Sequence, residues 1–230
     1  MTKKKIFVIA LVVCLIAILS AGSLAWFSAQ DSVKNEFFIA ASDDLTKDDI
    51  FSVDVMERVD QDNDGVYDTT LSAPEGYDYK DIQPGDKLVK EPFVRNTGYY
   101  DQYIRVTVTI SDAAAWVNAL GADADVTKVL VGFDADKWTH IWNNTNGATQ
   151  LPEELVYVMY YKDILKSGED VSVFTHVQIP TSLDQEQAAL FGGDFSISIK
   201  AEAVQTENVV PEGTAAEDAA WAAFKTVESK

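Results

Sequence analysis

Apolar and polar residues alternate with a period of two along much of the chain. The alternation is clearest in four segments, 51–59, 104–110, 171–179 and 195–203. Because successive side chains of a β-strand point to opposite faces, each segment predicts a strand with one buried face. The segment 155–161 is apolar on both faces, which is typical of a strand in the middle of a sheet.

Turn-forming residues separate the predicted strands. Combinations such as Pro-Gly, Asn-Gly and Ser-Gly favour tight turns, and turns are expected at 83–86, 96–98, 146–147 and 167–168. Many short strands with little helix between them indicate an all-β fold. The pattern therefore predicts an antiparallel β-sandwich with a few short helices.

Two short segments have a helical pattern. The first is 112–120, with Ser111 or Asp112 as its expected cap. The second follows the TAAE stretch at 214–217, which matches a capping box. Three large apolar residues then share one helical face: Trp221, Phe224 and Val227. The polar stretch 205–216 indicates a loose connection to a peripheral helix.

The N-terminus has the three parts of a secretory signal peptide. Three lysines come first, an unbroken apolar run follows over 6–19, and the small residues Ser23 and Ala25 end the segment. A membrane anchor is the alternative, but a helix needs about 20 apolar residues to cross a bilayer, and this run is shorter. The sequence predicts cleavage between Ala25 and Trp26, so the membrane is a partner only before the signal is removed.

The composition predicts an acidic protein once the signal has been cleaved. Residues 1–25 contain three of the 18 basic residues and none of the 37 acidic ones, so cleavage changes the formal net charge from −19 to −22. Nucleic acid and anionic lipid bind through Lys and Arg, and this charge argues against both as partners. The only cysteine, Cys14, leaves with the signal. A chain of this length can bury a core without a disulfide.

One acidic loop, 60–68, is a candidate calcium site. Carboxylates at alternate positions of a tight loop can converge on one ion, and Gly65 permits the sharp turn. Four aspartates supply the candidate ligands: Asp60, Asp62, Asp64 and Asp68. The twelfth position, which is a glutamate in an EF-hand, is Leu71 here. The alternative is an ordinary hairpin with a two-residue turn at Asp64 and Gly65. Calcium is the one cofactor that the sequence suggests.

Candidate catalytic residues are few, and we expect no enzyme activity. The chain has two histidines and no H-E-x-x-H zinc motif, and the cleaved chain has no cysteine nucleophile. His176 is expected on a solvated strand face, and His140 is expected to pack among aromatic residues. The many tyrosines and tryptophans are expected to pack in the core and on the sheets, with stacking on sugar rings as the alternative.

Four stretches of the chain together resemble one protein family. They are AGSLAWFSAQDSVKNEFFIA at 21–40, DIQPGDKLVKEPFVRNTGYYDQYIRVTVTI at 81–110, YKDILKSGEDVSVFTHVQIP at 161–180 and FSISIKAEAVQTENV at 195–209. They are similar to the TasA/camelysin family, which Gram-positive bacteria secrete through a W-type signal peptidase. The resemblance implies a jelly-roll-like β-sandwich that assembles into biofilm-matrix fibres outside the cell.

The resemblance also implies how subunits join. The segment after the signal has a strand pattern of its own, in which Val33, Phe37 and Ile39 share a face. In the family, such a strand leaves its own subunit and completes the sheet of a neighbour, which gives a head-to-tail homopolymer. The alternative is an ordinary edge strand within its own domain.

These inferences divide the chain into four parts. Residues 1–25 are the signal peptide, 26–40 the N-terminal strand, 41–204 the β-sandwich domain, and 205–230 a C-terminal extension with a short helix. The predicted function is that of a secreted structural protein of the extracellular matrix or cell surface. Two alternatives stay open, a camelysin-like secreted metallopeptidase and a sugar- or surface-binding sandwich module. The chain lacks a zinc motif, so the peptidase activity of some family members is not transferred to it.

Overall fold

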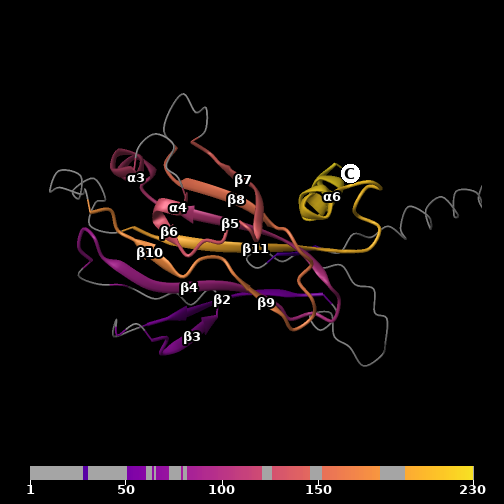
Figure 1. Ribbon diagram of the computed structural model, residues 1–230, viewed down its shortest axis with the longest axis horizontal. Helices are drawn as coiled ribbons and strands as arrows, with labels where there is room; N and C mark the ends of the chain where they lie inside the picture. Colours follow the sequence, from indigo (N-terminus) through magenta and orange to yellow (C-terminus); the bar gives the residue numbers. More distant parts are fainter. Residues whose placement is uncertain are drawn as a thin grey trace, which may run out of the picture.

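The computed structural model shows two antiparallel β-sheets that pack face to face as a sandwich (Figure 1). The structure describes residues 28–30, 51–60, 64, 66–72, 79, 82–120, 126–145, 152–181 and 195–229. The predicted antiparallel β-sandwich is confirmed.

In the described part of the chain, five strands form the first sheet, which we call the β5 sheet. In spatial order they are β1 (Ser28–Gln30), β11 (Ile197–Gln205), β5 (Gln102–Ile110), β8 (Leu155–Tyr161) and β7 (Trp138–Asn143). Every neighbouring pair is antiparallel. The inner face of this sheet supplies much of the core, because Ile104, Val106 and Val108 are fully buried. The double-sided apolar segment 155–161 is β8, which lies between β5 and β7 as expected.

The second sheet, which we call the β4 sheet, has six strands among the described residues. They are β3 (Thr69–Ser72), β2 (Val53–Val59), β4 (Lys87–Asn96), β10 (His176–Gln178) and β6 (Leu130–Val131) in spatial order, with β9 (Asp170–Ser172) also paired to β4. Its apolar face meets that of the β5 sheet, so the core lies between the two layers (Figure 1).

The predicted strand over 171–179 is present but interrupted. It appears as β9 and β10, which pair with β4 in one continuous register, Ser172 opposite Phe93 and His176 opposite Val89. The gap between them lies opposite Pro92, which has no N–H to donate to the ladder. The carbonyl of Pro92 still accepts a hydrogen bond from the Val173 N–H at 2.9 Å. The interruption is therefore a local loss of pairing without a change of register.

The inner face of β2 is not wholly apolar. Val53, Val55 and Val59 point inward as expected, but Glu57 lies on the same face and is 8% exposed. Lys90 of β4 donates a hydrogen bond from Nζ to Glu57 Oε2, so the buried carboxylate is paired with a buried cation. The alternation pattern alone does not reveal this ion pair, because the two residues are far apart in the sequence.

Helices are short in the described part of the chain. They are α3 (Ala113–Leu120), α4 (Val126–Val129), the 3-10 helix η1 (Ala216–Asp218) and α6 (Ala219–Glu228). The side chain of Trp116 in α3 is fully buried and meets the ring of Phe195 edge-on at 5.3 Å. This contact closes the core at the end where β11 begins. The helix expected over 112–120 is confirmed.

The predicted capping box before the last helix does not form. The Thr214 hydroxyl donates instead to the carbonyl of Pro211 at 2.8 Å, and η1 begins at Ala216 without a side-chain cap. The helix is held by tertiary packing, which removes the need for a strong local start signal.

Candidate functional site

The edge of the β5 sheet at β1 and β11 is the candidate site, because it holds the described start of the predicted N-terminal strand. Ser28, Ala29 and Gln30 pair with Val204, Ala203 and Glu202 of β11, respectively. On its other side β11 pairs with β5 over its whole length. Within the described residues, no strand pairs with the remaining outer edge of β11, from Ile197 to Ala201.

None of the residues predicted for this site lies in the part of the chain that the structure describes. The cleavage residues Ala25 and Trp26 lie outside the described residues, as do Val33, Phe37 and Ile39. The described strand β1 begins shortly after the predicted cut and lies on β11 of its own chain. The structure thus shows β1 as an edge strand of its own chain, and strand exchange stays a prediction.

Both faces of β11 are covered near this edge. Ala201 and Ala203 point into the sandwich core and are fully buried. Glu202 and Val204 point to the outer face and are also buried, at 7% and 1% exposure. The side chains at this end of β11 are therefore packed on both faces of the sheet. An added strand can contact β11 only through the backbone groups of its edge.

Helix α6 provides the cover on the outer face of the β5 sheet (Figure 1). Its small residues Ala220 and Ala223 let the helix come close to the sheet, and both are fully buried. The ring of Phe224 packs at 5.7 Å from that of Tyr160. The patch that receives the helix consists of Tyr103, Tyr160 and Val204 with the partly buried Val158. A second, smaller core thus lies outside the sandwich.

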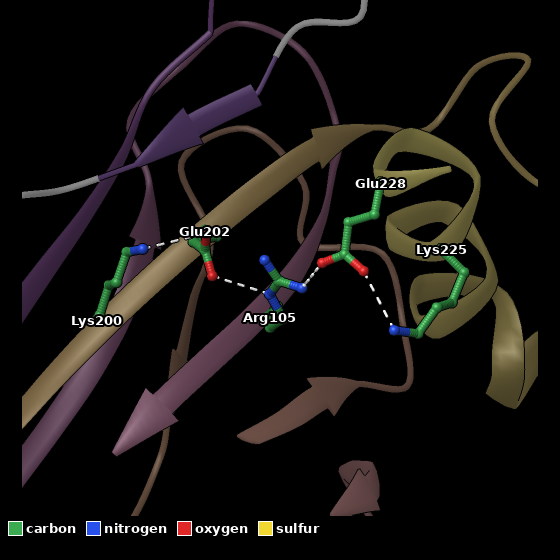
Figure 2. A network of polar contacts seen from close by, with 5 residues as sticks. All are labelled: Arg105, Lys200, Glu202, Lys225 and Glu228. Atoms are coloured by element: carbon green, nitrogen blue, oxygen red, sulfur yellow. Dashed lines mark hydrogen bonds and ion pairs between the residues drawn. The ribbon is translucent and has the colours of Figure 1, made fainter. Parts of the chain in front are cut away.

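A chain of charged residues crosses this second core from β11 to α6 (Figure 2). Arg105 of β5 donates from Nε to Glu202 Oε2 at 2.9 Å and from Nη1 to Glu228 Oε1. Lys200 bonds the other oxygen of Glu202 at 3.3 Å, and Lys225 bonds the other oxygen of Glu228 at 3.2 Å. The network links the strand that receives β1 to the helix behind it.

The network also sets the charge state of its members. Burial tends to lower the pKa of Arg105, but hydrogen bonds from its guanidinium to Glu202 and Glu228 outweigh this effect and raise the pKa. Partial burial tends to raise the pKa of Glu228, but hydrogen bonds from Arg105 and Lys225 reverse the effect and lower it. Both groups are charged at neutral pH.

His140 of β7 packs against the C-terminal helix and not against its aromatic neighbours in the sequence. Its ring stacks on Trp221 at 4.6 Å and 14°, and Nε2 lies 2.7 Å from Asp218 Oδ1. The backbone of His140 has φ 48°, where the register of β7 shifts between Thr139 and Trp142. The expected aromatic packing is present, but the partner comes from a distant segment. His176 is half-buried on β10, with Nδ1 2.8 Å from the Thr175 hydroxyl.

The acidic loop connects β2 to β3. Val59 pairs with Thr69, so the hairpin has a longer loop than the two-residue turn at Asp64 and Gly65 that was considered as an alternative. Asp60 is 3% exposed, and its Oδ1 accepts a hydrogen bond from the Asp64 N–H at 3.2 Å. Asp62 lies outside the described residues. Calcium binding therefore stays a prediction.

Among the residues that the structure describes, no group of three or more His, Cys, Asp or Glu side chains is arranged to hold a metal ion. Asp68 closes the acidic loop through its N–H, which donates to the carbonyl of Val59 at 2.9 Å. This contact fixes the base of the hairpin.

Most aromatic residues pack, as expected from the sequence. Trp116, Trp138, Tyr157 and Tyr160 are at most 5% exposed. Three others are well exposed: Tyr99 at 65%, Trp142 at 52% and Tyr100 at 47%. Trp142 lies on the edge strand β7, whereas the two tyrosines lie together on the turn between β4 and β5.

Sequence reasoning missed the docking of α6 on the sheet. The available signal was on β5 and β11, where Tyr103 and Val204 interrupt the polar face of strands that otherwise alternate. The alanines of 219–223 were a second signal, because small residues allow a helix to lie close to a sheet.

Comparison with known proteins assigns no relative to this chain. No family model, no curated protein and no solved structure matches it. In the part of the chain that the structure describes, none of the helices is long and apolar enough to cross a membrane. A functional assignment therefore depends on the sequence and on the geometry of the β11 edge.

Proposed function

We propose that this protein is a secreted structural protein whose N-terminal segment joins subunits head to tail by adding a strand to β11 of a neighbour. In this proposal a W-type signal peptidase cuts between Ala25 and Trp26 and frees the segment. The subunits then build fibres in the extracellular matrix or on the surface of a Gram-positive bacterium. The protein acts as its own partner.

The observation that carries the proposal is the pairing of β1 with β11. The third to fifth residues after the predicted cut, Ser28 to Gln30, lie on this edge in antiparallel register. Backbone hydrogen bonds of a ladder depend little on which chain supplies the strand. The edge that receives the segment of its own chain can therefore receive the same segment of another chain with the same ladder.

The short ladder that the described residues of β1 form favours exchange between chains. Within the described part of the chain, this ladder covers three residues of the nine in β11. A strand of this length contributes little stability when it pairs at one edge, so release from its own subunit costs little. At high protein concentration, mass action favours pairing of the segment with a neighbouring subunit over pairing within its own chain.

The cover on both faces of β11 also supports the proposal. The sandwich core and α6 already bury the side chains near the edge. A strand added from a neighbour would meet an edge held in place by Arg105 and Glu202, and little would have to be ordered on binding. Head-to-tail addition of this kind need not close into a ring, so it produces filaments.

Deletion of residues 26–40 tests the proposal. The protein that begins at Trp26 is expected to form filaments in electron microscopy, and the deleted protein is expected to stay monomeric with an intact β-sheet circular-dichroism spectrum. Ala29→Pro provides a finer change, because it removes one backbone donor from β1 and leaves the rest of the segment. Ala29→Ser keeps that donor and serves as the matched control. Filaments in both the deleted and the proline variants would rule out strand exchange.

A further inference from the structure

We propose that Tyr99 and Tyr100 form the contact by which the body of one subunit meets the body of the next. The inference rests on the proposed function, because it takes the partner to be a second copy of this chain. It adds a second interface, built from the β4–β5 turn, to the strand that joins the subunits.

The two tyrosines have the exposure and geometry of a binding patch. They are 65% and 47% exposed, and their rings meet edge to face with centroids 5.3 Å apart. Exposed aromatic side chains supply a large contact area at a low cost in side-chain entropy, and tyrosine is enriched among the residues that dominate interfaces. The pair offers such an area at one end of the sandwich.

The turn that carries the pair is held rigidly. Asn96 is fully buried, and its Nδ2 donates to the carbonyls of Tyr100 at 2.8 Å and Leu165 at 2.9 Å. Its Oδ1 accepts a hydrogen bond from the Gly98 N–H at 3.0 Å. The Ser167 hydroxyl donates to the carbonyl of Gly98 at 2.7 Å. A patch fixed in this way loses little conformational freedom on binding.

The same turn is fastened to the start of the described body of the protein. The Gly98 N–H and the Gln102 side chain both donate to the carbonyl of Ser52, at 3.2 and 2.9 Å. The fit is close, because a Cβ on Gly98 would lie 2.7 Å from the Ser52 nitrogen. The N-terminal segment joins the body at this point. A neighbour that captures the segment is therefore tethered to the end that displays the tyrosines.

The direction of β1 places the two subunits end to end. Ser28 lies beside Val204 and Gln30 beside Glu202, so the strand runs toward the end of β11 at Ile197. A captured segment leaves the acceptor at the Ile197 end of β11. The body of the donor is connected to the segment there, and its end with Tyr99 and Tyr100 faces the acceptor. Residues 31–50 span at most about 70 Å when extended. Such a tether raises the effective concentration of the two ends to the millimolar range, where a small aromatic patch suffices.

The test combines Tyr99→Ser and Tyr100→Ser in one protein and compares its assembly with that of the wild type. The double variant is expected to raise the critical concentration for filaments at least about tenfold, because truncation of aromatic interface residues commonly costs that much. Its melting temperature is expected to stay unchanged, since both rings are exposed. Trp142→Ser is the matched control, because Trp142 is similarly exposed but lies on β7 at the opposite edge of the sheet.

A second measurement separates this inference from the proposed function. An Ala29→Cys subunit mixed with an Ala203→Cys subunit forms a disulfide between chains if β1 is exchanged. Cross-linking that persists in the tyrosine double variant, together with the raised critical concentration, supports the contact through Tyr99 and Tyr100. An unchanged critical concentration would overturn this contact but not the proposed function. Failure to cross-link in the otherwise wild-type pair would overturn the proposed function and the inference with it.

Discussion

Arg105 connects three elements of the protein. It lies on β5, hydrogen-bonds Glu202 on β11 and Glu228 on α6, and its guanidinium carbon lies 4.5 Å from the centre of the Phe224 ring. The planar guanidinium can bond two carboxylates and stack on a ring at once, which a lysine cannot do. We therefore regard Arg105 as the residue that positions α6 behind the β11 edge.

The ion pair between Arg105 and Glu228 predicts a dependence of stability on pH. The pKa of Glu228 is lowered in the folded protein, so its contribution to stability is present at neutral pH and is lost as the pH falls through that lowered pKa, below the ordinary value of 4.5. Glu228→Gln is expected to cost about 0.5 kcal/mol at pH 7, because the pair is partly exposed. Thermal unfolding of the two proteins at pH 7, 5 and 3 checks this. A difference that persists unchanged at pH 3 would contradict the assignment.

Calcium binding by the acidic loop can be tested through its effect on the melting temperature. If the loop holds calcium, millimolar calcium raises the melting temperature of the wild type, and Asp64→Asn with Asp68→Asn abolishes the rise. Differential scanning fluorimetry with and without chelator measures the shift, and magnesium at the same concentration controls for ionic strength. No shift in the wild type would leave the loop as a structural hairpin.

At the level of elements, helix α6 contributes one large buried side chain to its contact with the sheet, that of Phe224. Phe224 is 3% exposed and packs on Tyr160 and Arg105, whereas Trp221 on the same helix is 36% exposed. Phe224→Ala is expected to destabilise the protein by about 3 kcal/mol, because it leaves a cavity under the helix. Trp221→Ala is expected to cost less than about 1 kcal/mol. Urea unfolding measures both, and equal costs would show that the helix is not held by the Phe224 ring.

The sequence predicts most of the elements but not their packing. Alternation locates β2, β5 and β11, because a period of two is a local property of a strand between core and solvent. The pairing of Glu57 with Lys90 and the stacking of His140 on Trp221 join residues that are distant in the sequence. No local pattern encodes such contacts. The predicted capping box is absent for a related reason, because tertiary packing on the sheet decides where α6 begins.

The candidate site was predictable in part. The strand pattern and the resemblance indicated the N-terminal segment, but only the register of Ser28–Gln30 identifies β11 as its partner. Helix α6 was expected as a peripheral element on a loose connection. It covers the outer face of the β5 sheet instead, and Val209 in the connection is 1% exposed.

At the scale of the whole molecule, the net charge opposes assembly. A chain with 37 acidic and 18 basic residues repels its own copies at low ionic strength. Salt screens this repulsion, so added salt is expected to favour the proposed assembly. In the proposed function, removal of the signal also frees the segment that the next subunit captures. Export and assembly would then be linked in one cleavage.

Exchange of β1 between subunits can be detected by a disulfide that joins β1 of one chain to β11 of another. Ala29 pairs with Ala203, and the protein that begins at Trp26 contains no cysteine of its own. Each protein carries one substitution, Ala29→Cys or Ala203→Cys, so a disulfide between these two positions can form only between chains. Antiparallel partners lie about 4.5–5.5 Å apart at Cα, which a disulfide can bridge.

If β1 is exchanged, the mixture, oxidised after filaments have formed, gives a covalent dimer of the two proteins on a non-reducing gel. Peptide mapping is expected to identify the bond between positions 29 and 203. Each protein oxidised alone controls for pairing between identical cysteines. A mixture with filaments but no bond between these positions would contradict the exchange of β1 onto β11.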